Sequence, residues 1–478
     1  MAVYPCSPRR QVLCTVLGGI LLLLLLAATH PGARDIGTNY VEYANGEPPP
    51  PTYEALRKWE DELPQHNLDL PFPEGRSGRY VKFSNQMHLV GWNNCLNERL
   101  MNAHLAYMSR RAYVFSDYWW SVDHYAWPPA QHSPDGLRTP VTALLAGPMV
   151  GGPWDVGDDA PRSISERWFD VVCPPNERRL INTADVKPPV AEASGAAVFA
   201  HWQKLLLSAP ERCIEVVPAP LEVDSMPQVF DLWVWGSTRV FSLWDIFADS
   251  PTSRLLAPSP IVQSAIDRNA YLFLPRGPRP SHPAPRDPFA RMLAVHVRRG
   301  DYLSHCRNLA MWGSTYYSWA QLPVLLDKFT PLPGDDPRRE DAVLEHCLPT
   351  LPQLMRRISD VRREYVQGGP DRVLDVLYLL TNEKGEWLDE LKDALRNAGW
   401  HTLVTTRELV LDAEQIDVSN AVDMQLARMA AVFLGNGVRR APCRVPPLTL
   451  YSGQRHPPSD DLDIGAYKMG QWRILELD

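Results

Sequence analysis

The sequence predicts an α/β protein with two doubly wound domains, and three observations support this prediction. The chain of 478 residues is long enough for two ordinary domains, each with its own core. Its composition, 45% hydrophobic and 22% charged, is that of a folded globular protein. In both halves short apolar runs alternate with stretches of helical periodicity, which is the pattern of parallel sheets covered by helices.

The N-terminus predicts the compartment. Arg9 and Arg10 precede an uncharged run, Val12–Thr29, whose length is close to the ~20 residues that cross a bilayer as a helix. We expect a cytoplasmic tail at 1–11 and a transmembrane signal anchor at 12–29. The run ends in small residues that are suited to a cleavage site, so a cleaved signal peptide is the alternative interpretation. Both alternatives place the rest of the chain in the lumen, as a single-pass type II protein of the Golgi or ER membrane if the run is retained.

A polar, proline-bearing segment at 30–78 is expected to be a stem that separates the folded part from the membrane. The N-terminal domain is expected at 79–285. It opens with the alternating strand RYVKF, a turn at Gly91, a helix and a second strand, RAYVFSDY. Strand, helix and strand in this order form one unit of a parallel sheet. The rest of this domain is aromatic and rich in loops.

Six prolines within the segment RNAYLFLPRGPRPSHPAPRDPFAR indicate a domain boundary, and the C-terminal domain is expected at 286–478. Its predicted strands are MLAVHV, VLDVLYLLTN, HTLVTT and VFLGN. The predicted helices are EWLDELKDALRNAG, closed by Gly399, and SNAVDMQLARMAA. Sheets of this type bind ligands at the carboxyl ends of their strands, so two such domains facing each other would form a ligand cleft.

The first strand of the C-terminal domain runs into the motif AVHVRRGDY. His296 and Arg298 share one face of this strand, and Arg299 lies on the other. Gly300 permits a sharp exit, and Asp301 can hold an arginine or a ligand hydroxyl. Arginine is costly to bury and its forked donors match phosphate oxygens, so the motif predicts an anion site. The alternative is a structural Arg–Asp pair that closes a turn.

The stretch HVRRGDY resembles the H-x-R-x-G-D-type signature of the GDP-fucose-dependent protein O-fucosyltransferases and the related α1,6-fucosyltransferases. Two further stretches agree with this resemblance. GWNNCLNERLMNAHLAYMSRRAYVF is similar to the N-terminal loop and helix of that family, and LYLLTNEKGEWLDELK followed by NAVDMQLARMAAVFLGNG is similar to the C-terminal half of its nucleotide-binding domain. The match consists of scattered motifs in the correct order over residues 79–437.

The resemblance implies a GT-B fold, in which two Rossmann-like domains face each other across a cleft. It implies metal-independent, inverting transfer of fucose from GDP-fucose to a protein or glycan acceptor, with no cofactor. Arg298 is the expected catalytic residue, on the β-phosphate, and Asp423 is expected on the guanine side. The residues expected to line the donor site are Gly91, Asn93, Asn94, His296, Arg298, Arg299, Asp301, Thr381, Asn382 and Asp423.

Structural alternatives exist for several of these residues. Asn93 or Asn94 is also suited to cap the helix that follows Gly91. Thr381 and Asn382 also fit a plain strand-to-helix turn, and Asp423 fits a solvent-facing helix position. Three tryptophans of the first domain are consistent with an acceptor platform or with core packing: Trp119, Trp120 and Trp127.

The chain departs from the family in two places. Val90 stands where some relatives have a glutamate base, so no base is assigned. The titratable residues nearby are His88, Glu98, Asp117, Asp123 and His124. After FLGNG the sequence differs from that of relatives, and Arg439 or Arg440 is the available substitute for their phosphate-binding residues. These departures keep open an inactive, membrane-tethered relative that binds a GDP-sugar or a glycan.

Six cysteines, Cys95, Cys173, Cys213, Cys306, Cys347 and Cys443, would lie in an oxidising lumen. They allow fifteen complete pairings. We expect Cys306 to pair with Cys347, because both flank the same long loop. No Cys/His cluster has zinc spacing, so no structural metal is predicted.

Other function classes find less support. The formal net charge of −8 and the lack of a long basic run argue against a nucleic acid partner. A metal-dependent GT-A glycosyltransferase would need an acidic D-x-D motif. The candidate strings are Asp461-Leu462-Asp463 and DVGDD at 155–159, both in loop-like sequence.

Overall fold

The computed structural model describes residues 49–88, 91–134, 136–276, 286–300, 302–312, 319, 322 and 332–435. The expected tail, signal anchor and first part of the stem lie outside these residues, as does everything after residue 435. Over the described part of the chain, every helix is too short or too polar to span a bilayer.

The first half is built on a five-stranded sheet with the order β6-β2-β1-β8-β7. All four pairings are parallel. Its strands are β1 (Tyr80–Phe83), β2 (Ala112–Phe115), β6 (Ile164–Ser165), β7 (Arg179–Asn182) and β8 (Cys213–Val217). The chain moves from β1 through β2 to β6 and later adds β8 on the other side of β1. The strand order therefore reverses between β1 and β8.

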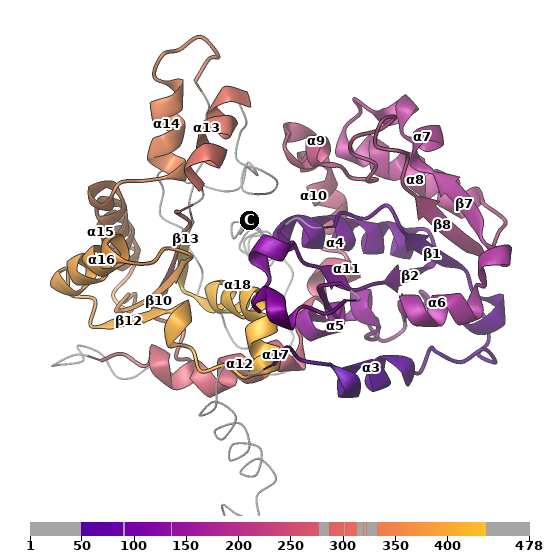
Figure 1. Cartoon of the computed structure of the whole chain (residues 1–478), viewed down its shortest axis with the longest axis horizontal. Helices are drawn as coiled ribbons and strands as arrows, with labels where there is room; N and C mark the ends of the chain where they lie inside the picture. Colours follow the sequence, from indigo (N-terminus) through magenta and orange to yellow (C-terminus); the bar gives the residue numbers. More distant parts are fainter. Residues whose placement is uncertain are drawn as a thin grey trace, which may run out of the picture.

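The described part of this half also contains helices of 4 to 17 residues. They are α4 (Trp92–Met108), α5 (Val141–Leu144), α6 (Glu166–Val172), α7 (Thr183–Val186), α8 (Gly195–Ser208), α9 (Leu232–Trp235), α10 (Phe241–Phe247), α11 (Pro251–Arg254) and α12 (Pro260–Asn269). Two small antiparallel ribbons complete the half: β3 (Tyr118–Trp119) with β4 (Arg138–Thr139), and β5 (Leu145–Ala146) with β9 (Ala257–Pro258). In Figure 1 α4 extends from the middle of the molecule along the first sheet.

The second half contains a four-stranded parallel sheet with the order β12-β11-β10-β13. Its strands are β10 (Met292–Val297), β11 (Val376–Thr381), β12 (Thr402–Thr405) and β13 (Val432–Leu434). Its helices are α13 (Tyr302–Trp312), α14 (Arg339–Cys347), α15 (Leu351–Gln367), α16 (Glu386–Asn397), α17 (Ala413–Asp417) and α18 (Ser419–Met429). The prediction of an α/β fold with parallel sheets is confirmed in both halves.

The two faces of β10 pack against different helices. Met292 and Ala294 belong to the core that includes α18 and the first half, whereas the alternate residues Leu293, Val295 and Val297 belong to a second core with α15 and α16. Figure 1 shows α18 between the second sheet and the first half, and α15 and α16 on the outer side. The predicted alternation of this strand is confirmed, and it decides which way the following motif points.

The two halves share a hydrophobic core that contains residues of both sheets. At their junction, Asn269 of α12 donates from Nδ2 to the carbonyl oxygen of Val410 (3.0 Å), and the Val410 amide donates to Asn269 Oδ1 (2.7 Å). Arg268 forms an ion pair with Asp412 at 3.0 Å. The junction is therefore held by polar contacts as well as by apolar packing.

Residues 49–78, expected to belong to the stem, pack against the folded halves instead. They contain α3 (Glu54–Asp61), which is preceded by Tyr53. The Tyr53 hydroxyl donates to Asp417 at 2.7 Å, and buried Glu60 accepts from the Thr142 hydroxyl at 2.5 Å. The sequence looks polar because the outward side of α3 is charged, while its few buried residues make specific long-range bonds.

Two disulfides lie in the described part of the chain. Cys306–Cys347 links α13 to α14, which confirms the expected pairing. Cys173–Cys213 links the end of α6 to β8. The buried Cys95 thiol donates to the Met87 carbonyl oxygen at 3.4 Å. Cys443 lies outside the described residues.

Candidate active site

The carboxyl end of β10 carries two buried polar residues. His296 is 3% exposed and Arg298 is 7% exposed. Both lie on the side of the sheet that faces α18 and the first half, as the alternation requires. The Arg298 guanidinium lies over the Tyr302 ring, with 5.0 Å between its central carbon and the ring centroid. Tyr302 belongs to the same motif, and its contact with Arg298 was not predicted from the sequence.

The His296 imidazole is buried with neither ring nitrogen hydrogen-bonded to any residue that the structure describes. Burial, with a smaller contribution from the Arg298 charge, lowers the pKa of His296 to about 3. The imidazole is therefore neutral near pH 7, with one nitrogen able to donate and the other able to accept. A buried polar group without a partner is unfavourable unless a ligand or water satisfies it.

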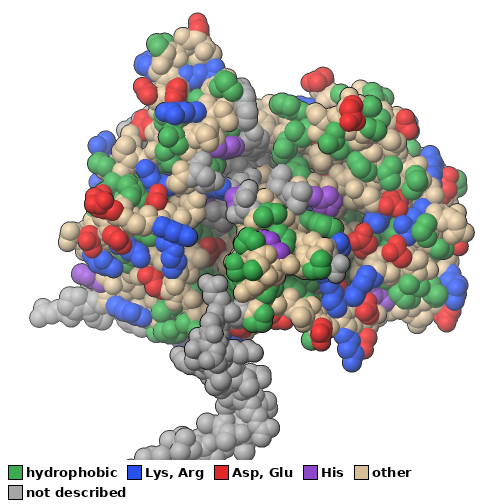
Figure 2. All heavy atoms as spheres, viewed as in Figure 1, with side chains coloured by type: hydrophobic (Ala, Val, Ile, Leu, Met, Phe, Trp, Pro, Cys, Tyr) green, Lys and Arg blue, Asp and Glu red, His purple; other side chains and the backbone are tan. Residues whose placement is uncertain are grey.

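Arg298 lies beside the point where the strand order of the second sheet reverses. The chain runs from β10 to β11 and β12, and then crosses to β13 on the other side of β10. In open parallel sheets ligands bind outside the carboxyl ends of the strands at such a switch point. The face drawn in Figure 2 is hollowed where the two halves meet, and acidic and basic side chains are interspersed on both sides.

Asn382 fixes the chain as it leaves β10. The Arg299 amide donates to Asn382 Oδ1 at 2.9 Å, and Asn382 Nδ2 donates to the Arg299 carbonyl oxygen at 3.1 Å. Gly300 follows with a φ of +69°, a conformation that favours glycine. Thr381 accepts from the Glu383 amide at 3.1 Å. These contacts support the turn alternative for Thr381 and Asn382, with Asn382 as the link between the ends of β10 and β11.

Arg299 points away from Arg298. Its Nη1 donates to the Pro349 carbonyl oxygen at 2.8 Å, its Nε lies 3.5 Å from a Glu383 carboxylate oxygen, and its guanidinium stacks 4.1 Å from the Trp387 ring. The predicted donor contact of Arg299 is therefore not supported, because protein groups on the α15–α16 side occupy its guanidinium. Asp301 lies outside the described residues.

Asp423 is buried on α18, so the solvent-facing alternative is wrong. Its Oδ1 accepts from the Tyr378 hydroxyl and its Oδ2 accepts from the Thr406 hydroxyl at 2.9 Å. Burial raises the pKa of Asp423 to about 6. This network attaches α18 to β11 and to the turn after β12, and the guanine contact of Asp423 stays a prediction.

The N-terminus of α4 is formed without a capping side chain. Gly91 is the N-cap, and Asn93 and Asn94 lie within the first helical turn, so the capping alternative is wrong. Asn93 is buried, and its Oδ1 has no partner among the described residues. The first turn carries no acidic residue. Its amide groups and the helix dipole favour an anion at this end of α4.

Glu98 supports the loop that leads into α4. It is fully buried, and its Oε2 accepts from the Met87 amide at 2.6 Å. Burial raises the pKa of Glu98 to about 8. These contacts give Glu98 a positioning role that the sequence did not indicate, because its partner is defined only by the folded loop.

The other titratable residues near α4 differ in exposure. Asp117 is paired with Arg57 at 2.6 Å. His88 and His124 are exposed, and His88 contacts the edge of the Trp119 ring at a centroid distance of 6.0 Å. The side chain of Asp123 and the whole of Val90 lie outside the described residues.

The three tryptophans considered as an acceptor platform have different environments. Trp120 is buried and donates to the Thr139 hydroxyl at 2.7 Å. Trp127 is also buried. Trp119 is partly exposed, with the Arg138 guanidinium 3.8 Å from one ring face. Core packing therefore accounts for Trp120 and Trp127, whereas Trp119 lies near the surface.

The three aspartates of the DVGDD string each contact another side chain of the protein. Asp155 pairs with Arg254 at 2.7 Å, Asp158 accepts from Tyr107 at 2.8 Å, and Asp159 pairs with Arg110 at 2.5 Å. Over the part of the chain that the structure describes, no three His, Cys, Asp or Glu side chains converge as a metal site. Asp461 and Asp463 lie outside that part.

Comparisons with known proteins found similar solved structures. The protein O-fucosyltransferase POFUT1 in complex with GDP-fucose is 15% identical, with a TM-score of 0.43 over 76% of this chain and 91% of that chain. Its apo form is 14% identical (TM-score 0.40, 75% and 91%), and its GDP complex is 13% identical (0.39, 76% and 91%). No family model matches the sequence. No curated protein matches it either.

Proposed function

We propose that this protein transfers fucose from GDP-fucose to a protein or glycan acceptor, with inversion and without a metal ion. The observation that carries the proposal is the buried pair His296 and Arg298 at the carboxyl end of β10, beside the switch point of a parallel sheet. The motif HVRRGDY, similar to that of GDP-fucose-dependent fucosyltransferases, supplies the identity of the donor.

The chemistry requires a group that stabilises negative charge. Breaking the bond between sugar and phosphate leaves positive charge on the sugar and adds negative charge to the diphosphate. Arg298 supplies a guanidinium whose donors match phosphate oxygens, in a site sheltered from water. His296, neutral at pH 7, adds one hydrogen-bond donor to a phosphate or ribose oxygen. The N-terminus of α4 supplies amide donors from the first half.

The test is calorimetric binding of GDP and UDP to the full chain in detergent, with and without EDTA. We expect GDP to bind in EDTA and Arg298→Ala to lose the binding. Arg396→Ala is the matched control, because Arg396 is an exposed arginine of α16 that contacts Asp393. Equal GDP affinity of the Arg298→Ala variant would exclude the anion site. Binding that needs a divalent cation would favour a metal-dependent enzyme instead.

A second candidate function is binding of a GDP-sugar without transfer. It is favoured by the environment of Glu98, which is fully buried and hydrogen-bonded to the Met87 amide rather than open as a base. GDP release from GDP-fucose, measured with mixed protein and glycan acceptors, separates the two candidates. Turnover excludes the binding protein, and tight GDP-fucose binding without any release supports it.

A further inference from the structure

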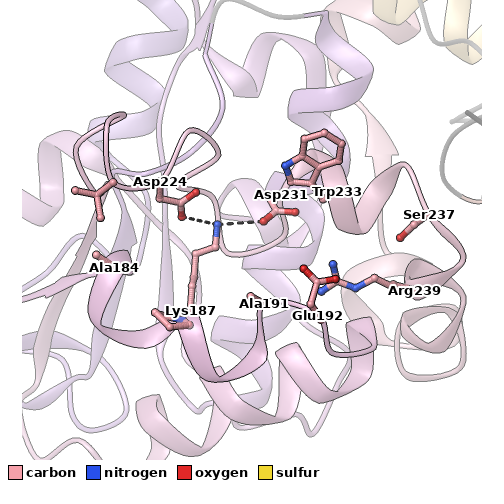
Figure 3. A pocket seen from close by; sticks show the side chains of 11 residues that line it. Ala184, Lys187, Ala191, Glu192, Asp224, Asp231, Trp233, Ser237 and Arg239 are labelled. Carbon is pink, nitrogen blue, oxygen red and sulfur yellow. Dashed lines mark ion pairs between the residues drawn. The ribbon is translucent and has the colours of Figure 1, made fainter. Parts of the chain in front are cut away.

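A pocket lies in the first half, and none of the predicted donor-site residues lines it. Its volume is about 470 Å³, and it opens between α7, the loop after it, the segment that precedes α9, and α9 itself (Figure 3). The proposed transferase function gives this pocket no role, and the sequence did not indicate it, because its walls come from two separate segments, residues 184–192 and 223–239.

The cation at the floor of this pocket is neutralised by the protein. Lys187 Nζ lies 2.7 Å from Asp224 and 3.1 Å from Asp231, and both ion pairs are drawn in Figure 3. Asp231 also caps α9, since its Oδ1 accepts from the Val234 amide at 3.0 Å. These charges therefore fix the shape of the pocket and are already paired.

The second cation is also engaged. Arg239 Nε donates to the Ala193 carbonyl oxygen at 2.6 Å. Two cations and three carboxylates line the pocket, so its formal net charge is −1. A pocket with this balance and with an internally paired lysine offers little to a strongly charged ligand.

Apolar groups and one carboxylate remain at the opening. Trp233 is 67% exposed and Val223 is 68% exposed. Glu192 is exposed, and no hydrogen bond or ion pair engages it among the residues that the structure describes. Figure 3 shows the Trp233 indole above the pocket and Glu192 on its other side, next to Arg239. An exposed indole at the rim of a concavity marks an interaction site rather than core packing.

We propose that this pocket binds a neutral pyranose ring of the acceptor. The flat indole of Trp233 stacks on the apolar C–H face of the ring, and the Glu192 carboxylate accepts hydrogen bonds from the ring hydroxyls. Sugars present these two kinds of surface together, and they carry no charge that the pocket would have to match. The inference rests on the proposed function and sharpens it, because it names a glycan as the acceptor.

The position of α9 agrees with an acceptor role. Trp235, on the same helix as Trp233, packs against Trp319, with ring centroids 5.7 Å apart. Trp319 belongs to the part of the chain that follows Arg298 and α13. The helix that presents Trp233 therefore borders the second half, and a glycan held on it extends along the first half beside the donor-binding half.

The test is saturation-transfer NMR of the full chain with four neutral oligosaccharides: fully N-acetylated chitotriose, cellotriose, mannotriose and lactose. We expect at least one to bind at about 10 mM or below and Trp233→Ala to weaken it at least tenfold. Glu192→Gln should weaken it severalfold. Trp59→Ala is the matched control, because Trp59 is 49% exposed on α3, outside the pocket, and its loss should change nothing.

Three outcomes overturn the inference. They are that no sugar binds, that sugar binding survives Trp233→Ala, or that a lysine-rich peptide binds this pocket and the sugars do not. GDP affinity, measured on the same variants, separates this inference from the donor site. Sugar binding without GDP binding would support a glycan-binding protein and contradict the proposed transferase function. GDP binding without sugar binding would support the donor site and contradict the proposed sugar site in this pocket.

Discussion

Both sheets reverse their strand order beside their first strand, but they use the residues at that point in opposite ways. In the first half the loop after β1 is braced by the protein itself. Asn85 Nδ2 donates to the Pro227 carbonyl oxygen at 2.9 Å, and Glu98 accepts from the Met87 amide at 2.6 Å. These bonds hold the loop that positions the start of α4.

In the second half the two residues at the switch point, His296 and Arg298, are buried on the side that faces α18 and the first half. His296 has no hydrogen bond to the described residues, and Arg298 packs on the Tyr302 ring. The hydrogen bonds that hold the chain at this switch point are made by the residue after Arg298: the Arg299 backbone bonds to the Asn382 side chain. The comparison teaches that the first switch point is braced by the protein's own hydrogen bonds, and we propose that the second is where an anion is held. The predictions below test this division.

Arg298→Ala should have the largest effect and reduce GDP affinity about a hundredfold or more, because charge-assisted bonds to phosphate are lost. Arg299→Ala should leave GDP affinity within about threefold and lower the free energy of unfolding by about 1–3 kcal/mol, since its partners Pro349 and Glu383 are structural. Calorimetry measures the GDP affinity of both variants, and thermal unfolding measures their stability. Equal losses of affinity would contradict the division between the two arginines.

Glu98→Ala should destabilise the first half by about 3 kcal/mol, because it leaves the Met87 amide buried without its acceptor. Glu98→Gln keeps an acceptor and should cost about 1 kcal/mol. Thermal unfolding of the two variants measures this. A Glu98→Ala variant as stable as the native protein would show that the loop after β1 is not braced by this residue.

Stability should also fall with rising pH through Glu98. Burial raises its folded pKa to about 8 from the ordinary value of 4.5, so the protonated form favours the folded state. This contribution is fully present below pH 4.5 and is lost as the pH rises through about 8, with a slope of at most ~1.4 kcal/mol per pH unit. The free energy of unfolding, measured between pH 5 and 8, should depend less on pH for Glu98→Gln than for the native protein. An equal pH dependence in the two proteins would exclude Glu98 as the titrating group.

Asn382→Ala should reduce GDP affinity by about fivefold, far less than Arg298→Ala, because the exit from β10 loses both bonds to Asn382. Asn397→Ala is the control, since Asn397 is an exposed asparagine at the end of α16. Calorimetry measures both. A loss as large as that of Arg298→Ala would mean that Asn382 contacts the ligand directly.

The parallel strands of the second half were predicted correctly because each is a short run rich in apolar or β-branched residues. The opposite orientations of Arg298 and Arg299 also followed from the two-residue period of a strand. The start of α4 was missed by two or three residues, since asparagine is a common N-cap and the sequence cannot show that Gly91 takes that position.

Other features could not be predicted because their partners are far apart in the sequence. Asp423 is buried by a bond from Tyr378, 45 residues earlier. Tyr53 is held by Asp417, 364 residues later, so a segment of polar composition was mistaken for a stem. In the middle of the chain the helices and strands are short and local periodicity is weak, and tertiary contacts decide the structure there.

The contact of Tyr53 with Asp417 has a practical consequence for where the chain tolerates a cut. Thr139 donates to the same Asp417 oxygen at 2.6 Å, so one carboxylate joins the residue that precedes α3, the β3–β4 ribbon and α17. A cut after residue 78 would remove α3 and its contacts to both halves. A truncated form that keeps this fold should therefore begin ahead of Tyr53.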